Sequence, residues 1–383
     1  MHADSRLRAA RQARAYSQQQ LADMAGVSRQ AIAGVESGLS DPSLRTALAL
    51  ASALGMTVEE LFGAATPILP LTARPAVPLG EQGARVTVAP MGEGYVAFPL
   101  RGPSASRAGF LPAHGLACGP DGDPGTAREV QPIGPPRLTL IVAGCDPALP
   151  LLEAPLALLD PPVSLAWWPC PSREALELAA RGLVHVAGTH LRGPARAGGD
   201  GPAAGLLPQG GEVIGFCCWR EGLVLRPDVA GGVVSVSDVA RRKLRLVNRE
   251  PGAEARRLLD HALSEAGIDA GQLPGYRTQV TGHLQVAAAI SAGLADAGIA
   301  SEPAALAYGL AFVPLAAEQF NLVIPAGQAG SREVQGLRKV LSSAWLLNQL
   351  ASLPGYDPGP CGEHVTTLAP ARVSRPGAAA PAR

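Results

Sequence analysis

The sequence lacks an excess of charge of either sign, a long apolar run and a secretory signal. Its 32 basic and 32 acidic residues give a formal net charge of zero, which excludes a general affinity for polyanions. No apolar run reaches the length that crosses a bilayer, and residues 1–30 are polar. We therefore expect a soluble, cytoplasmic protein with no membrane partner.

Motifs for metal binding and catalysis are also missing. The six cysteines include no C-x-x-C pair, and in a reducing cytosol we expect free thiols. His185 and His190 flank an expected strand end, but no third ligand follows at the spacing of a zinc site. The chain has no nucleophile elbow and no phosphate loop. We therefore predict no metal site, no cofactor and no enzymatic activity.

The most informative stretch is residues 17–38, SQQQLADMAGVSRQAIAGVESG. Ser17 and Gln20 form a capping box before one helix, and Gly26 suits the turn that follows it. Ser28 can cap a second helix. Two short helices joined by a tight turn are the layout of a helix-turn-helix, whose second helix enters the major groove of DNA.

Residues 4–63 resemble the phage-repressor-type, or XRE-family, helix-turn-helix domain through the runs SQQQLA, GVSRQAI and VESG. Three flanking segments, Leu7–Arg14, Ser43–Leu54 and residues 57–62, suit the other helices of that domain. The alternative is a helical hairpin with no DNA role.

This resemblance implies contacts with double-stranded DNA from six residues, which are Ser17, Gln18, Ser28, Arg29, Gln30 and Arg45. Gln18 and Ser28 would approach phosphates, and Arg45 would add a further phosphate contact. Arg29 and Gln30 would read base edges, since arginine pairs well with guanine and glutamine with adenine. So few long side chains predict modest specificity for one copy, and therefore a homodimer on a palindromic operator. A local basic patch is expected at Arg6, Arg8, Arg11 and Arg14.

After residue 63 the composition changes twice. Residues 64–82 are rich in proline and small residues, which predicts a linker. Alternating apolar residues across a glycine-rich turn then predict a small β module at 83–134, too short to bury much alone and therefore packed against a neighbour.

From residue 137 the pattern is strand then helix, repeated, with two segments that cross between regions. This predicts a bilobed α/β domain at 137–352, so the whole chain is expected to be multidomain. Its lobe one covers 137–212 and 320–352, and its lobe two covers 223–315. Two further expectations are a glycine-rich loop at 192–211 and a disordered tail at 366–383.

Residues 137–350 resemble the periplasmic-binding-protein-like (type 2) domain that is fused to a helix-turn-helix in bacterial regulators. They are also similar to domains linked to molybdate and molybdenum-cofactor metabolism. The resemblance is carried by AGCDPAL at 143–149, SREAL at 172–176, VAGTHL at 186–191, VNREPG at 247–252, HLQVAAA at 283–289 and ADAG at 295–298.

Such a domain holds its ligand in the cleft between the lobes, where helix N-termini that converge form an anion site. The ligand-binding candidates are Asp146, Ser172, His190, Arg249, Gly252, Arg256, Thr281 and His283. The alternatives are that Ser172 and Thr281 only cap helices, that the arginines lie on the surface, and that the histidines are structural.

One departure from the family weakens the oxyanion interpretation. Relatives carry a Gly-Ser-Gly-Thr-Arg-like turn, whereas this chain has GAEAR at 252–256, which loses two hydroxyls and places Glu254 where it repels an anion. We expect a one-component transcriptional regulator that senses a small ligand, with molybdate as one candidate and an amine or a polar neutral ligand as another. The alternatives are a bilobed domain that only dimerises, or an enzyme with Asp146 and His190 as an acid–base pair.

Overall fold

The computed structural model describes residues 3–63, 69–100, 111–123, 125–190 and 206–370. The chain forms two compact units, Met1–Ile68 and Leu69–Arg383, which are treated separately below. None of the helices in these ranges is long and apolar enough to cross a bilayer.

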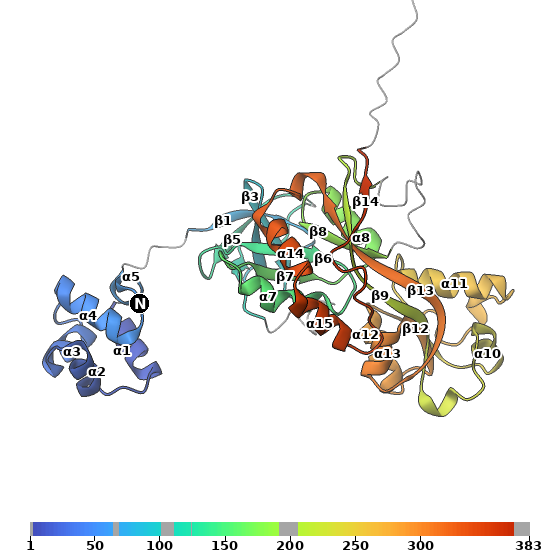
Figure 1. Cartoon of the computed structure of the whole chain (residues 1–383), viewed down its shortest axis with the longest axis horizontal. Helices are drawn as coiled ribbons and strands as arrows, with labels where there is room; N and C mark the ends of the chain where they lie inside the picture. The colour runs from blue at the N-terminus through green and yellow to red at the C-terminus, as the bar shows by residue number, and fades with distance from the viewer. Residues whose placement is uncertain (1–2, 64–68, 101–110, 124, 191–205, 371–383) are drawn as a thin grey trace, which may run out of the picture. The chain divides into compact units, whose positions relative to one another are not determined.

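The first unit is a bundle of short helices (Figure 1), α1 (Ala3–Ala13), α2 (Gln18–Ala25), α3 (Arg29–Glu36), α4 (Leu44–Leu54) and α5 (Val58–Phe62). The predicted capping box is confirmed, since the Ser17 hydroxyl accepts the Gln20 N–H and the Gln20 side chain accepts the Ser17 N–H. Gly26 has a φ of 65°, and Ser28 caps α3. The fully buried side chains are Leu7, Leu21, Ile32, Leu50, Leu54 and Leu61.

The second unit begins with a closed barrel, made of β1 (Leu71–Pro75), β2 (Arg85–Met91), β3 (Gly94–Pro99), β4 (Gly115–Ala117) and β5 (Arg128–Pro132). The linker prediction for 64–82 is wrong where β1 lies, because this strand pairs with both β3 and β5. Pro75 is tolerated because it is the last residue of the strand. Val96 and Phe98 pack against Ala187 and its neighbours in the next domain, which confirms that the module packs against a neighbour.

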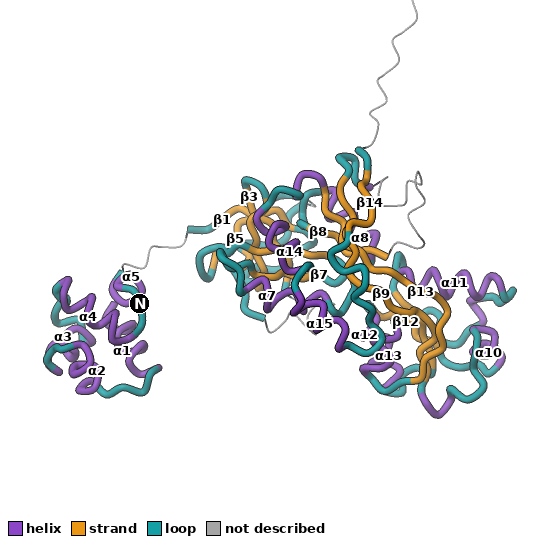
Figure 2. The backbone as a smooth tube through the Cα atoms, viewed as in Figure 1, coloured by secondary structure: helices purple, strands orange, loops and turns teal. Residues whose placement is uncertain are grey.

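One mixed sheet runs through the rest of this unit in the order β11-β10-β12-β9-β13-β8-β6-β7, and β14 pairs with β9 (Figure 2). Two antiparallel strands of 15 residues each, β9 (Gly211–Leu225) and β13 (Ala311–Pro325), extend through both lobes. The other strands are β6 (Thr139–Ala143), β7 (Ser164–Trp168), β8 (Val186–His190), β10 (Leu246–Arg249), β11 (Gln279–Val280), β12 (Ala297–Ser301) and β14 (His364–Leu368).

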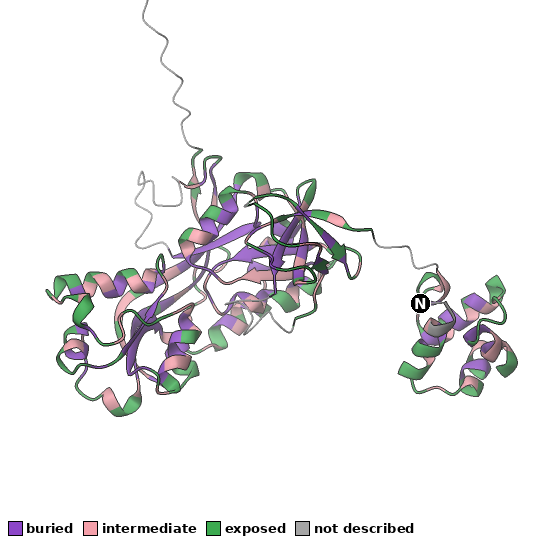
Figure 3. Ribbon diagram, turned by 180° about the vertical axis from the view of Figure 1, so that it is seen from behind, coloured by how far each residue is buried: buried purple, intermediate pink, exposed green. Residues whose placement is uncertain are grey.

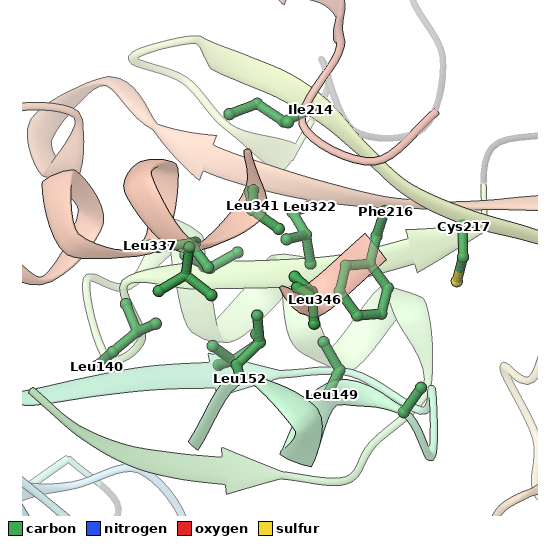
Figure 4. Close-up of a cluster of buried hydrophobic side chains, with 14 of the residues drawn as sticks. Leu140, Leu149, Leu152, Ile214, Phe216, Cys217, Leu322, Leu337, Leu341 and Leu346 are labelled. Carbon is green, nitrogen blue, oxygen red and sulfur yellow. The ribbon is translucent and has the colours of Figure 1, made fainter. Parts of the chain in front are cut away.

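Helices cover the sheet in both lobes. Those of lobe one are α7 (Glu153–Ala157), α8 (Ser172–Ala180), α14 (Arg332–Leu341) and α15 (Ala344–Ser352), and those of lobe two are α10 (Val236–Arg241), α11 (Glu254–Glu265), α12 (His283–Ser291) and α13 (Glu302–Ala307). The strands β6, β8, β10 and β12 are buried, whereas the edge strands β7, β11 and β14 are only partly buried, and the outer faces of the helices are exposed (Figure 3). In lobe one, Leu337, Leu341 and Leu346 lie over the buried strand residues Leu322 and Phe216 (Figure 4).

The predicted fold class is therefore confirmed, with three local differences. The apolar runs at 213–219, 223–226, 312–315 and 320–324 predict four strands, whereas the first two are one continuous strand, β9, and the last two are one continuous strand, β13. The apolar spacing in 331–350 predicts one helix, but the segment forms two, because Ser343 caps a second one. The disorder predicted for 366–383 is wrong at 366–368, which belong to β14, and residues 371–383 lie outside the described part of the chain. Most of the predicted loop at 192–211 also lies outside it.

Candidate functional site

A cavity of about 390 Å³ lies where the two lobes face each other. Lobe one contributes Cys145, Pro147, Trp167, Pro169 and Cys170 to its wall, and lobe two contributes Arg249, Glu250, Thr281, Gly282, His283, Leu284, Gln285, Ala288 and Tyr308. A narrow space next to it is enclosed by Cys145, Ser172, His190, Arg249 and His283, among others. The lobe junction therefore brings together five of the eight predicted ligand residues, which are Ser172, His190, Arg249, Thr281 and His283.

His190 ends β8 and is buried close to a thiol and a carboxylate. Its Nε2 lies 3.1 Å from the Cys145 Sγ, and its Nδ1 lies 3.8 Å from the Glu318 Oε2 on β13. Burial disfavours a charged imidazole, but Cys145 and the acidic groups outweigh burial and raise the pKa of His190 well above its ordinary value. His190 therefore favours a positive charge at neutral pH.

His283 is the first residue of α12, and its pKa shifts in the opposite direction to that of His190. Its Nδ1 accepts the Ser301 N–H at 3.2 Å and lies 3.8 Å from the Glu221 Oε1 on β9. Its buried Nε2 has no hydrogen-bond partner in the described part of the chain. Burial, followed by the charges of Arg249 and His190, lowers the pKa of His283 well below its ordinary value. His283 is therefore neutral at physiological pH.

Arg249 ends β10 and is only 2% exposed. Its Nε and Nη2 donate to the Glu250 carboxylate at 2.8 and 2.9 Å, which leaves the buried Nη1 without a hydrogen-bond partner among the described residues. An orphaned guanidinium N–H in the wall of a cavity is a strong donor for an incoming acceptor. Arg256 lies outside the cavity, since it donates to the Arg249 carbonyl and stacks on Tyr276.

Neither Ser172 nor Thr281 caps a helix in the way the sequence predicts. The N-cap of α8 is Pro171, and the Ser172 hydroxyl accepts the His190 N–H at 3.2 Å. The N-cap of α12 is Gly282, whose φ of 99° suits glycine, and Thr281 lines the cavity.

Asp146 and Gly252 stand apart from the cavity lining. Asp146 is fully buried within lobe one, where it accepts the Ala148 N–H at 2.6 Å and the Tyr356 hydroxyl at 3.1 Å. Burial raises the pKa of Asp146 from 3.8 to about 6, against the effect of these hydrogen bonds. Gly252, with a φ of 89°, forms the turn before α11.

Sequence reasoning missed Cys145, Glu221 and Glu318. Both carboxylates are fully buried, although glutamate is rarely buried unless it is paired. The available signal is a glutamate inside a long apolar stretch, Glu221 in β9 (which also has Glu212 near its start) and Glu318 in β13.

In the first unit, the DNA-binding candidates divide by exposure. Arg29, Gln30 and Arg45 are exposed, as are the helix caps Ser17 and Ser28. Gln18 is half-buried and donates to Glu36 at 2.9 Å.

The expected basic patch on α1 is smaller than the sequence suggests. Arg11 makes a two-pronged ion pair with the buried Glu36, at 2.6 and 3.0 Å. Burial opposes the charge of this carboxylate, but Arg11 and Gln18 outweigh it and lower the pKa of Glu36. Arg11 therefore joins α1 to α3, and its charge is already balanced.

Two family models match the chain, a helix-turn-helix at residues 7–61 and a PBP superfamily domain at residues 154–342. The uncharacterized protein YvgK of Bacillus subtilis is 31% identical over 138 residues, which are 36% of this chain and 44% of YvgK, so less than half of that relative is matched. An uncharacterized protein from the 5′ region of a ferredoxin gene in Clostridium pasteurianum is 33% identical over 112 residues, or 29% of this chain and 99% of that protein.

Solved structures resemble each unit. The restriction-modification controller protein C.AhdI from Aeromonas hydrophila is 42% identical, with 16% of this chain and 91% of that chain covered, at a TM-score of 0.15. The regulatory domain of CcmR from Synechocystis PCC6803, in complex with 2-PG, is 13% identical, with 53% of this chain and 94% of that chain covered, at a TM-score of 0.40.

Proposed function

Because the chain belongs to the proteins that join an XRE-type helix-turn-helix domain to a PBP superfamily domain, we propose that it is a one-component transcriptional regulator. It binds operator DNA through α3 and a small effector in the cavity between the lobes. The observation that carries this proposal is the cavity between the lobes with Arg249 in its wall, in the same chain as a helix-turn-helix whose α3 begins with exposed polar residues. A domain built of two lobes can couple a ligand to DNA only if the ligand favours one arrangement of the lobes.

The cavity supports a small organic anion better than a bare oxyanion. Its volume of about 390 Å³ is within the range of sites for organic ligands. Trp167, Leu284 and Tyr308 offer apolar surface, while the orphaned Nη1 of Arg249 offers one strong donor for a carboxylate or phosphate. Glu250 already occupies the other two donors of Arg249 and repels a compact, highly charged ion such as molybdate.

The DNA-binding side of the proposal rests on α3. Arg29 and Gln30 are exposed in its first turn and Arg45 is exposed on α4, so these side chains are accessible to base edges and to phosphates. We propose a homodimer on a palindrome, because a recognition helix with two long polar side chains at its start has limited specificity on its own.

The test begins with the purified full chain. Ligands that copurify are identified by mass spectrometry, with elemental analysis for molybdenum and tungsten, and each is then titrated calorimetrically beside molybdate, tungstate and sulfate. We expect an organic anion to bind and to change the affinity for operator DNA. Heat from molybdate alone would identify an oxyanion sensor instead. Binding of no compound, with intact DNA binding, would favour a lobe pair that only dimerises.

A further inference from the structure

The lobe junction brings together three side chains with metal-binding chemistry. Cys145 follows β6, His190 ends β8, and His283 begins α12. Each offers one ligand atom, and the three atoms all lie within 4.8 Å of one another. They come from both lobes, and both histidines are buried.

We propose that Cys145, His190 and His283 bind a divalent cation of the first transition row, with Zn²⁺ as the probe, at the junction of the lobes. A thiolate with two imidazoles is a typical ligand set for Zn²⁺, and a set of three protein ligands leaves a fourth position open. This proposal differs from the expectation of no metal site, because that expectation considered only the spacing of candidate ligands along the chain. The three ligands are 45 and 93 residues apart in sequence and meet only in the fold.

The ligand atoms are close to the separation that a metal requires. Ligand atoms of a tetrahedral zinc site lie about 3.5 Å apart, as its bond lengths of about 2.0 to 2.3 Å imply. The Cys145 Sγ and His190 Nε2 are already 3.1 Å apart. The most distant pair of atoms must approach by about 1 Å, which small rotations of the side chains can supply.

A carboxylate lies behind each histidine, which is the second independent observation. The Glu318 Oε2 is 3.8 Å from the Nδ1 of His190, and the Glu221 Oε1 is 3.8 Å from the Nδ1 of His283. Histidines that bind metal usually donate their other ring N–H to a carboxylate, which orients the ring and makes the ligand more basic. Glu221 and Glu318 therefore lie near the position of such supporting carboxylates, and each must come about 1 Å closer to its histidine to accept a hydrogen bond.

The charges near the site also favour a cation. Glu221 and Glu318 are fully buried, and Cys145 can add a third negative charge as a thiolate. The nearby positive groups are the guanidinium of Arg249, which is paired with Glu250, and the His190 imidazole, whose charge is lost when a metal replaces its proton. A divalent ion at this position would place positive charge beside the two buried carboxylates when His190 gives up its proton.

Binding requires protons to leave. His283 now accepts the Ser301 N–H at Nδ1, so its Nε2 carries the proton when the ring is neutral. The metal replaces the proton on Nε2, and Nδ1 takes up a proton and turns to Glu221. His283 therefore releases no net proton, whereas the metal displaces the proton on the His190 Nε2, so metal binding should release protons in an unbuffered titration.

Co²⁺ is the spectroscopic probe for the full chain after chelator treatment. We expect one Co²⁺ per chain, with the ligand-field bands of a tetrahedral ion and a sulfur-to-cobalt charge-transfer band, both removed by Zn²⁺. Cys145→Ser should abolish the charge-transfer band, and His190→Ala or His283→Ala should weaken binding at least 100-fold. Cys218→Ser and His261→Ala are the matched controls, because these side chains lie outside the cluster.

Glu318→Gln tests whether His190 binds metal with the support of Glu318 or has only a structural role. Loss of a supporting carboxylate should weaken Co²⁺ binding about 10–100-fold but keep the charge-transfer band. Thermal melting of every variant shows whether it is folded. A wild-type chain that binds no Co²⁺, or a folded Cys145→Ser chain with an unchanged spectrum, would overturn the proposal.

The metal test needs no DNA and no effector, so its outcome is independent of the proposed function. Any regulatory role of the metal does rest on that function, since the site adjoins the effector cavity. If Zn²⁺ binds and leaves operator affinity unchanged, the metal site stands and its regulatory role is excluded. If operator affinity responds to an organic anion while Co²⁺ does not bind, the effector proposal stands and the metal proposal is wrong.

Discussion

Arg29 is the residue that we propose to read a base edge of the operator. It is exposed at the start of α3, so its removal should not disturb the core of the first unit. Arg29→Ala should cost about 1–3 kcal/mol of specific operator binding, because a base-edge contact is lost, and leave non-specific binding nearly unchanged.

Arg45→Ala is the matched control for Arg29→Ala, measured by fluorescence anisotropy on operator and random DNA. As a phosphate contact, Arg45 should affect both DNAs about equally and reduce the salt dependence of binding. An equal loss on both DNAs for Arg29→Ala would remove it from the base-reading set.

Asp146 should make the second unit more stable in mild acid. Its pKa rises from 3.8 to about 6 on folding because the carboxyl is buried. The folded state therefore holds the proton more tightly, and this contribution is full below about pH 3.8 and lost as the pH rises through about 6. The difference between the two pKa values corresponds to about 3 kcal/mol.

Asp146→Asn tests this contribution by urea unfolding at pH 4 and pH 7. The asparagine has no proton to bind, so the stability of the variant relative to wild type should rise by about 2 kcal/mol from pH 4 to pH 7, since the unfolded carboxyl is already partly ionised at pH 4. A pH-independent difference would show that Asp146 does not titrate in this window.

His185 should act in the opposite direction over nearly the same pH range. His185 directly precedes β8, is buried and accepts the Ile141 N–H at 3.0 Å. Burial lowers its pKa from 6.5 to about 4. Its stabilising contribution is present above pH 6.5 and is lost as the pH falls through about 4, which amounts to about 3 kcal/mol. His185→Asn can keep the accepted hydrogen bond and should reduce the loss of stability in acid. Unfolding curves that retain the full acid loss in this variant would assign it to another group.

At the scale of elements, β9 and β13 depend on glycine where the lobes join. A Cβ on Gly222 would lie 2.1 Å from the carbonyl oxygen of Val313 on the paired strand. Gly222→Ala should therefore force the two strands apart and destabilise the unit by about 1–3 kcal/mol. Gly231→Ala is the control, since a Cβ there meets no atom within 4 Å. Equal urea midpoints for the two variants would show that the strand pair adjusts without cost.

Local sequence signals predict much of this fold. The capping boxes of Ser17 and Thr57 are short-range patterns, and the structure contains both. The two long strands were expected as four, because Arg220 and Glu221 interrupt the apolar run of β9. Polar residues at a lobe junction have the same composition as a turn, and only tertiary pairing distinguishes the two.

The candidate site was harder to predict for the same reason. The functional side chains at the lobe junction come from elements far apart along the chain, and Cys145 carries no motif of its own. Resemblance and a place at the end of an element identified Arg249 and His283. In the sequence, Glu221 and Glu318 are only glutamates inside apolar stretches, and their position beside the two histidines follows from the pairing of β9 and β13. Local periodicity describes elements, but it does not say which ends of those elements meet.

For the whole molecule, the proposed homodimer implies that the second unit strengthens DNA binding by holding two first units together. Residues 1–68 have their own core and can be compared with the full chain on the same palindrome. We expect the fragment to bind at least about 100-fold more weakly, since tethering makes the second contact intramolecular. On a single half-site, fragment and full chain should bind about equally. Equal affinity on the palindrome would exclude the second unit as a dimerisation element.

The order of segments in lobe one has a consequence during synthesis on the ribosome. Lobe one needs α14, α15 and β14, and Tyr356 completes the surroundings of Asp146, so this lobe cannot close until the segment up to Leu368 has emerged. The first unit and the continuous lobe two can fold earlier, because domains generally fold as they leave the ribosome. A nascent chain therefore carries a folded helix-turn-helix unit well before the second unit is complete. Under the proposed function, premature termination inside lobe one would release a DNA-binding fragment that does not respond to the effector.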